Sequence, residues 1–492
     1  MKKNKAIPIM IFYLVSSIIL VYLCIFMDIL PNVYLYILMG VIAILFLVPF
    51  YFIVIRRKKS LQRRKAAIFF KFISLFLAIL YLFATLYLYE TYTAIDKIVV
   101  NEGEKLITIS VVVPVDEEET KFKRFDDKTY ALRDIIDIEN TDYAVSKIKE
   151  ITDSENETIK YIDFDGMVDA LYSGEADAMI LNESYRNLIV EHFPDFESKT
   201  KVLYEVQRAI PIERDPSADY NVSEPFSVYI SGNDYFGELA DSGRSDVNII
   251  MTINPKAHKI LLTTTPRDYY VGLYGDNYKM DKLTHAGVYG IDCSIETLEN
   301  LYGIDINYYM NVNFSSVIEI IDALGGVDVE VEHSFYVPKE DKNFTKGTMH
   351  MDGETALVFA RDRKHQPNGD KDRGKNQQRV LSAVINKLVS PAIIMNYTDL
   401  LDVAASNMQT NMSTDEITQL IKNQIIEMDS WEIEFQSVDG FGASRSTYSM
   451  GSRELYVMIP DEETLELAKD KINSVISPDD NIEVNPEVKP EI

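Results

Sequence analysis

The chain has 492 residues, a net charge of −27 and two cysteines. This length allows a membrane part and two globular domains, each with its own core. The strong negative charge argues against nucleic acid binding, which depends on surface bases that neutralise phosphates. Cys24 and Cys293 lie far apart, and Cys24 stands in an apolar run. The sequence therefore predicts neither a disulfide framework nor a cysteine metal site.

Three apolar runs open the chain and predict three membrane-spanning helices. They cover residues 7–27, 33–55 and 66–89, each close to the roughly 20 residues that cross a hydrocarbon core. The amino terminus and the loop RRKKSLQRRK at 56–65 are basic, and positively charged loops stay in the cytoplasm. We therefore predict a multi-pass membrane anchor over residues 1–89, with a cytoplasmic amino terminus. Everything after about residue 89 is then extracytoplasmic.

Residues 100–215 predict a small accessory α/β domain. The apolar, β-branched run after Lys105 is typical of a buried strand. Helical periodicity at 143–151 and 164–171 precedes a further strand at 177–181. This alternation indicates an α/β unit that carries no catalytic pair of its own.

A second, larger α/β domain is predicted over residues 225–476, after a polar boundary at 211–224. Its first strand ends near Asp234, and a hairpin follows, with strands at 247–253 and 259–265 around the turn signal Asn254-Pro255. In such a hairpin, residues whose numbers sum to about 512 face each other. Two arginines and two acids then meet at one end of the sheet: Arg244, Arg267, Asp246 and Asp268.

These four charged residues admit two interpretations. Ordinary surface salt bridges form at many strand ends and contribute little. A binding site for an anion is the other interpretation, and it needs further basic residues nearby.

Such residues occur at 356–379, ALVFARDRKHQPNGDKDRGKNQQR, where seven Lys and Arg stand against three Asp. Asp352 predicts the start of a helix that delivers Arg361 and Arg363 at its end. A second helix is predicted over 374–389, and its start would favour an anion. Because Arg presents a rigid fork of donors, this stretch is typical of diphosphate recognition. The competing interpretation is a solvated basic helix face.

The remaining elements complete the predicted α/β order. A helix at 291–301, a strand at 306–314, a helix at 315–326 and a strand at 327–333 indicate a βαβ succession. Helices at 397–405 and 413–428, strands at 431–440 and 455–459, and a helix at 461–476 follow. Residues 478–492, rich in Pro, Asp and Glu, predict a disordered acidic tail.

Six motifs in order resemble the LytR-CpsA-Psr family: GND at 232–234, RSD at 244–246, TPRD at 265–268, DKLTHA at 281–286, LGGVDV at 324–329 and LVFARDR…GDKDRGKNQQ at 357–378. The three-span anchor and the accessory module are similar to the capsule-associated CpsA-type members. The resemblance implies an αβα sandwich for the catalytic domain. It also implies transfer of a capsular or related glycan from a polyprenyl-pyrophosphate carrier to peptidoglycan.

The resemblance also assigns residues. It implies contacts to the pyrophosphate from Arg244, Arg267, Arg361, Arg363, Arg373 and Gln377, and metal binding by Asp234 and Asp246. The metal is expected to be Mg²⁺ or Mn²⁺. The expected partners are the carrier-linked glycan, the peptidoglycan acceptor, membrane lipid and other capsule-assembly membrane proteins.

The chemistry of these residues is consistent with that reaction. Phosphoryl transfer needs positioned cations, a metal held by carboxylates, and a group that deprotonates the incoming hydroxyl. Arg267 is the expected catalytic arginine, and Asp268 and Asp370 are both candidates for the general base.

Two other functions remain open at the level of sequence. The domain can be a non-catalytic polyprenyl-phosphate-binding regulator of capsule synthesis, or a transcriptional attenuator, which is the older label of the family. The predicted topology argues against the attenuator, since only the amino terminus and one basic loop face the cytoplasm.

Overall fold

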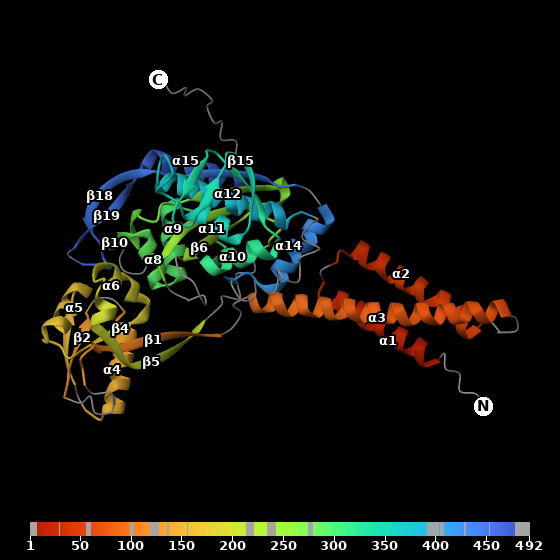
Figure 1. Ribbon diagram of the computed structural model, residues 1–492, viewed down its shortest axis with the longest axis horizontal. Coiled ribbons are helices and arrows are strands. Elements are labelled where there is room, and N and C mark those ends of the chain that lie inside the picture. Colours follow the sequence, from red (N-terminus) through yellow and green to blue (C-terminus); the bar gives the residue numbers. More distant parts are fainter. Residues whose placement is uncertain are drawn as a thin grey trace, which may run out of the picture.

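The computed structural model contains three apolar helices and an α/β body built on two main sheets (Figure 1). It describes residues 7–28, 30–55, 61–98, 103–118, 127–134, 137–154, 156–212, 221–233, 243–273, 279–390, 403, 408–427, 430–451 and 453–477. Of the predicted elements, the helix at 397–405 and the acidic tail therefore lie outside the description, apart from residue 403. Residues 56–60 of the basic loop and residues 213–220 of the boundary also lie outside it.

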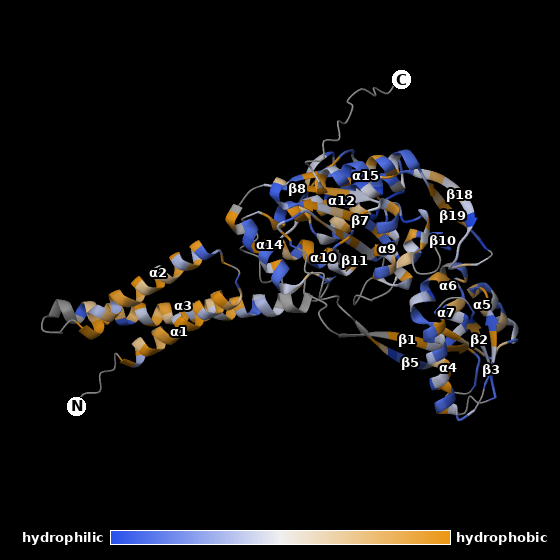
Figure 2. Ribbon diagram, turned by 180° about the vertical axis from the view of Figure 1, so that it is seen from behind, coloured by the Kyte–Doolittle hydropathy of each residue, from blue (hydrophilic) through white to orange (hydrophobic). Residues whose placement is uncertain are grey.

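The amino-terminal helices have the extent expected of membrane spans. They are α1 (Ile7–Phe26), α2 (Asn32–Phe50), continued by η1 (Tyr51–Ile55), and α3 (Leu61–Ile98). All three are long and apolar enough to cross a membrane, and Figure 2 shows their hydrophobic colouring running along the bundle. Their outward side chains are large and apolar, which suits contact with lipid. The third helix continues beyond the predicted end at residue 89.

A five-stranded sheet forms the smaller part of the body, with strand order β3-β2-β4-β1-β5. The strands are β1 (Gly103–Pro114), β2 (Thr129–Arg133), β3 (Glu157–Tyr161), β4 (Ala178–Asn182) and β5 (Thr200–Ile212). Helices α4 (Ile138–Thr152) and α5 (Phe164–Ser173) pack on opposite faces, because neighbouring residues of β1 point into two different cores. We call residues 103–212 the five-stranded module. The sequence missed β2, β3 and β5, and the status of this part as a separate accessory domain stays a prediction.

The larger part contains a six-stranded sheet with strand order β16-β11-β6-β7-β8-β17. The strands are β6 (Phe226–Asn233), β7 (Ser245–Asn254), β8 (Lys259–Thr264), β11 (Tyr308–Asn313), β16 (Gln409–Thr410) and β17 (Glu432–Ser437). The pairing is parallel for β11 with β6 and for β17 with β8, while β7 is antiparallel to both of its neighbours. Strands β11, β6, β8 and β17 therefore all run in one direction.

Helices cover both faces of this sheet. Helices α9 (Ile291–Tyr302) and α15 (Glu462–Ile476) share a core with Tyr229 and Leu261 of the sheet. Helices α12 (Asp370–Leu388) and α14 (Thr414–Glu427) pack on the other face, where Ile230 and Leu262 point. Successive residues of a strand point to opposite faces of the sheet and thus contribute to two separate cores. Cys293 packs against the first of these cores, whereas the buried Cys24 belongs to the core of the amino-terminal helices.

The predicted βαβ order is found, but its last strand does not join the six-stranded sheet. Strand β12 (Val327–Val331) follows β11 and α10 (Phe314–Ala323), but it pairs antiparallel with β15 (Gly347–Met351) in a separate ribbon. Its valines are buried while Asp328 and Glu330 are exposed. A strand with one polar face suits a ribbon packed on one side, whereas a parallel strand of a covered sheet is apolar on both faces.

Smaller elements lie where the two parts of the body meet. Strands β9 (Tyr270–Leu273) and β10 (Lys279–Lys282) form a ribbon, followed by α8 (Leu283–Ala286) and η5 (Gly287–Tyr289). Strands β18 (Gly440–Ser446) and β19 (Glu454–Pro460) form another. Figure 1 shows β10 and α8 beside the module's α6 (Arg186–His192). Further short elements include β13 (Phe335–Val337), β14 (Lys342–Phe344) and α11 (Gly353–Arg361).

Candidate active site at the strand ends

The strand directions place the candidate residues at one edge of the six-stranded sheet. The carboxyl ends of β11, β6, β8 and β17 meet at this edge, and β7 begins there. Arg244 directly precedes β7, Asp246 lies at its start, and Arg267 and Asp268 follow the end of β8. In open α/β sheets, ligands bind outside the carboxyl ends of strands.

The hairpin of β7 and β8 brings an arginine directly against an acid. The observed register pairs Ile249 with Thr264, so facing residues sum to 513 and the predicted register was wrong by one. Arg267, rather than Pro266, therefore faces Asp246, and Arg267 Nη1 donates to Asp246 Oδ1 at 2.8 Å. Asp268 pairs with Lys282 instead of facing Arg244, and the Asp268 Oδ1 to Lys282 Nζ distance is 3.1 Å.

These pairs are not ordinary surface salt bridges. The side chains of Asp246, Asp268, Arg267 and Arg244 are 9%, 20%, 22% and 27% exposed. Charged groups withdrawn from water to this extent interact more strongly than exposed pairs. The four predicted residues do collect at one end of the sheet. We call Arg244, Asp246, Arg267 and Asp268 the strand-end cluster.

Two residues of the cluster's surroundings were missed at the level of sequence. Lys282 pairs with Asp268, and Thr284 Oγ1 donates to Asp246 Oδ1 at 3.2 Å. The Thr284 amide also donates to the Arg267 carbonyl at 2.9 Å. Both residues belong to the motif DKLTHA, which the sequence analysis recognised. Their contacts with Asp268 and Asp246 are visible only in the folded chain, because these acids are distant in sequence.

Asp246 fits part of a divalent metal site. Its Oδ2 is buried and accepts no hydrogen bond from any residue that the structure describes, and Arg244 Nη2 lies 4.0 Å from it. An oxygen without a donor suits a cation, because Mg²⁺ binds through one or two carboxylates while keeping water and phosphate oxygens. The other predicted metal ligand, Asp234, lies outside the described residues, directly after Asn233. Within the described ranges no group of three or more His, Cys, Asp or Glu gathers as a metal site.

Arg361 reaches the same edge from another direction. It ends α11, and its guanidinium carbon lies 4.0 Å from the centroid of the Phe314 ring. Phe314 begins α10 directly after β11 ends at Asn313, so the stack fixes Arg361 beside the carboxyl end of β11. Arg363, two residues later, is exposed.

Helix α12 contributes Arg373 and Gln377, both half-buried. It begins at Asp370, four residues before the predicted start, and the side chain of Asp370 is outside the description. Gln378 Nε2 donates to the carbonyls of Leu262 and Gln436 at 3.2 and 2.6 Å. These bonds tie the first turns of α12 to β8 and β17, so Arg373 and Gln377 are held near the strand ends.

Three of the other bases of 356–379 pair with acids. Lys371 pairs with Asp439, Arg379 pairs with Glu332, and Lys375 Nζ lies 3.7 Å from Asp372. Asp372 also accepts the Asn368 amide at 2.9 Å, so an acid already stands at the start of α12. The solvated-face interpretation therefore fits Lys371, Lys375 and Arg379, and the anion-site interpretation fits the arginines near the strand ends.

His285 has a structural role in the support of the contacts around Asp281. It is buried, and its Nδ1 lies 2.6 Å from Asp281 Oδ1. Asp281 also accepts the Ser449 amide and hydroxyl on Oδ2, at 2.7 and 2.5 Å. Burial alone would raise the pKa of Asp281, but His285 and Ser449 outweigh it and hold that pKa below its ordinary value.

A comparison with protein families identifies the chain. The LytR_cpsA_psr family model matches residues 195–474, more than half of the 492 residues. The chain belongs to the LytR-CpsA-Psr family. The resemblance of the six motifs is thereby confirmed, and the matched range contains the whole strand-end cluster.

Curated members of the LytR-CpsA-Psr family include close relatives of this chain. One is polyisoprenyl-teichoic acid--peptidoglycan teichoic acid transferase TagU of Bacillus mycoides (strain KBAB4), 36% identical over 46% of this chain and 75% of that protein. TagU of Enterococcus faecalis (strain ATCC 700802 / V583) is 34% identical over 42% of this chain and 69% of that protein. The crystal structure of B. subtilis TagV shares 30% identity over 52% of this chain and 98% of its own, with a TM-score of 0.44.

Proposed function

We propose that this protein is a transferase that moves a glycan polymer from a polyprenyl-pyrophosphate carrier to peptidoglycan outside the cell membrane. The observation that carries the proposal is the strand-end cluster, in which Arg244 and Arg267 flank the largely buried Asp246. It lies in a chain of net charge −27 that belongs to the LytR-CpsA-Psr family. Concentrated guanidinium groups in an acidic protein favour a small polyanion over a nucleic acid.

In this reaction the hydroxyl oxygen of the acceptor attacks the glycan-side phosphorus. The bond between that phosphorus and the bridging oxygen breaks, and polyprenyl phosphate leaves. Arg267 and Arg244 on one side, with Arg361, Arg363, Arg373 and Gln377 on the other, orient the diphosphate and offset the charge that develops on its oxygens. The hydroxyl proton passes to Asp268 or to Asp370.

A divalent cation, Mg²⁺ or Mn²⁺, is part of this proposal. Bound to the diphosphate, it would neutralise part of the phosphate charge. Asp246 supports the assignment through its unsatisfied Oδ2, and Asp234 is the expected second ligand. Asp246 Oδ1 is meanwhile held by Arg267 and Thr284, which fixes the orientation of the carboxylate.

The predicted topology puts the site where the carrier is found. Asp28, in the turn between α1 and α2, pairs with Lys422 of α14, and Lys422 Nζ lies 2.8 and 2.9 Å from its two oxygens. The turn and the α/β body are therefore on the same side of the helices. This supports an extracytoplasmic body, because the amino terminus and the basic loop at 56–65 are predicted to be cytoplasmic.

The test is release of polyprenyl phosphate by the purified full-length chain in lipid nanodiscs. The assay contains Mg²⁺, peptidoglycan and a polyprenyl-pyrophosphate-linked glycan, with capsular and teichoic-type polymers in separate arms. We expect release by the wild type and a loss of about 100-fold or more for Arg267→Ala. Arg379→Ala is the matched control, because this arginine pairs with Glu332 and its loss should change the rate less than twofold.

Two results would count against catalysis. No release by the wild type with any polymer would favour the regulator that binds polyprenyl phosphate without reaction. Equal release by wild type and Arg267→Ala would show that the strand-end cluster is not the catalytic centre. In cells, Arg361→Ala separates the same two functions: a transferase loses polymer attachment, whereas a regulator retains attachment and changes polymer length.

A further inference from the structure

One short segment connects the strand-end cluster to a distant part of the molecule. This bridging segment, residues 281–289, comprises the end of β10, α8 and η5. On one side, Lys282 pairs with Asp268 and Thr284 donates to Asp246. On the other side, Asp281 accepts from Ser449, and the Tyr289 hydroxyl lies 2.9 Å from Ser449 Oγ.

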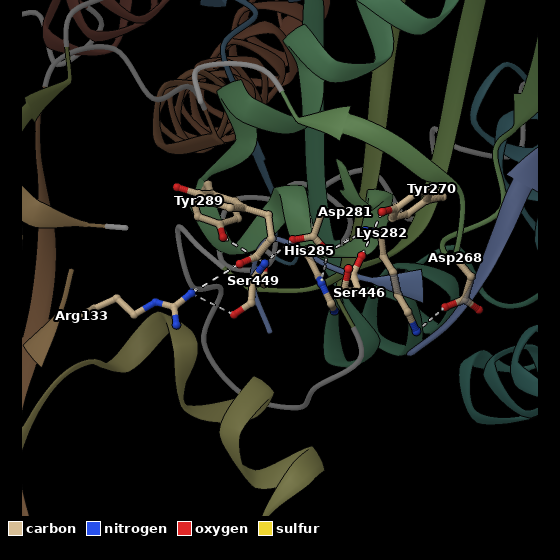
Figure 3. Close-up of polar contacts among 10 residues, drawn as sticks. Arg133, Asp268, Tyr270, Asp281, Lys282, His285, Tyr289, Ser446 and Ser449 are labelled. Atoms are coloured by element: carbon tan, nitrogen blue, oxygen red, sulfur yellow. Dashed lines mark hydrogen bonds and ion pairs between the residues drawn. The ribbon is translucent and has the colours of Figure 1, made fainter. Parts of the chain in front are cut away.

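The five-stranded module holds that second side. Arg133, at the end of β2, donates from Nη2 to the carbonyls of Tyr448 and Ser449 at 3.4 and 3.3 Å. Figure 3 shows the resulting series of contacts from Arg133 through Ser449 and Asp281 toward Lys282 and Asp268. Because the Ser449 hydroxyl proton goes to the ionised Asp281, Tyr289 is the donor to Ser449 Oγ.

Apolar packing joins the same two parts. Val288 of the bridging segment and Met450 of the adjoining loop are 3% and 1% exposed. Both belong to the hydrophobic core that α5 builds under the five-stranded sheet. The Tyr289 ring also meets that of Tyr185 edge-on, with 5.8 Å between centroids. The five-stranded module therefore shares one hydrophobic core with the bridging segment and packs firmly against it.

Arg133 is an unusual residue to bury at this contact. It is 6% exposed, its guanidinium lies 4.6 Å from the Phe164 ring centroid, and Nε and Nη1 have no hydrogen-bond partner among the described residues. No carboxylate of the described residues lies within ion-pair distance of it. The two carbonyls that accept from this buried cation both belong to the loop at 447–451, so Arg133 loses these hydrogen bonds if the loop moves away.

Resting on the proposed function, we propose that the five-stranded module positions the catalytic site through this contact. Arg133 and Ser449 are positioning residues: they fix the loop at 447–451, which fixes Asp281 and with it the bridging segment. The bridging segment in turn orients Asp268 and Asp246 through Lys282 and Thr284. Loosening the contact should weaken the alignment of Arg267 without removing any group that touches the substrate.

The experiment combines hydrogen–deuterium exchange with the release assay on the full-length chain in nanodiscs. We expect Arg133→Gln to raise amide exchange in peptides that cover 281–289 and 447–451, and to lower kcat/KM about tenfold. Arg208→Gln is the matched control, because this arginine lies on β5 of the same sheet and contacts Asn140 and Glu139. It should leave both measurements unchanged.

Ser449→Ala provides a second, milder variant. It removes the hydroxyl that Asp281 accepts while leaving Arg133 and the shared apolar core in place, so it decides the question if Arg133→Gln fails to fold. Unchanged exchange in 281–289 for the folded variants would overturn the proposal. If the wild type releases no polyprenyl phosphate, the proposed function fails, and the exchange measurement still tests the coupling by itself.

Discussion

The two basic regions of this protein differ in how their charges find partners. In the strand-end cluster, the pairing of β7 with β8 sets Arg267 against Asp246, Arg244 lies 4.0 Å from the same acid, and the group is largely buried. In the stretch at 356–379, Lys371, Lys375 and Arg379 pair with Asp439, Asp372 and Glu332, and Arg361 lies on an aromatic ring. The number of bases in 356–379 therefore overstates how many of them are available to bind an anion. The position of a base relative to the strand ends is the better guide to an anion site.

Among the substitutions that test this difference between the two regions, Asp246→Asn should reduce metal binding and activity the most. The substitution keeps the shape of the side chain but exchanges one carboxylate oxygen for a donor, and a donor cannot bind a cation. We expect Mn²⁺ affinity to fall by roughly tenfold or more, together with a loss of release of about 100-fold. Mn²⁺ binding is measured by electron paramagnetic resonance on the full-length chain.

Asp268→Asn is the control for the metal measurement. Asp268 belongs to the same cluster but pairs with Lys282, so its substitution should leave Mn²⁺ affinity unchanged whatever it does to the reaction. Equal Mn²⁺ binding by wild type and Asp246→Asn would remove Asp246 from the metal site. The unsatisfied Oδ2 would then need another explanation.

A smaller effect is expected where the second region reaches the strand ends. Arg361→Lys keeps the positive charge but loses the planar fork and most of its stacking on Phe314. We expect release to fall about tenfold, and Phe314→Leu to lower it a few-fold by removing the ring face. Lys364→Ala changes an exposed lysine of the same loop and should have no effect. Full activity of Arg361→Lys would show that charge alone is sufficient at this position.

Local sequence patterns predicted the parts of the fold that depend on near neighbours. The turn signal at Asn254-Pro255 gave the hairpin, with a register error of one residue, and that error concealed the contact between Arg267 and Asp246. Asp352 was expected to begin α11, and its carboxylate accepts the Thr355 amide. In these cases the deciding interactions lie within a few residues along the chain.

Contacts between distant segments were beyond reach of the same patterns. Strand β17 pairs with β8, and Arg133 contacts Ser449, which is 316 residues away. No local pattern in these segments indicates which distant segment each of them contacts. Lys282 and Thr284 illustrate the consequence for the site. Their motif was recognised, but their contact with Asp268 and Asp246 depends on how β10 and α8 pack against β7. Alternation within β12 is typical of a strand with one exposed face, because its acids are all on one face.

The smallest expected effect is a pH-dependent loss of folding stability when Asp281, which supports the strand-end cluster through the bridging segment, is substituted. The pKa of Asp281 is below its ordinary value in the folded protein, so its ionised form contributes stability above the ordinary pKa of about 3.9. That contribution is lost as the pH falls through the lower, folded pKa. Asp281→Asn offers one acceptor where His285, Ser449 and the Lys282 amide need two. We expect a loss of about 1–3 kcal/mol in the free energy of unfolding at pH 7.

Thermal unfolding of the full-length chain in detergent, at pH 7 and near pH 3, measures this difference. The gap between wild type and Asp281→Asn should narrow at the lower pH, because Asp281 then begins to take up a proton in the wild type also. Asp328→Asn serves as the control, since this acid pairs with His350 at the surface and should shift stability little at either pH. A gap that widens toward pH 3 would mean that Asp281 is protonated in the folded protein at neutral pH. The neutral carboxyl group of Asp281 would then hold the bridging segment. Lys282 alone would supply the charge that orients Asp268.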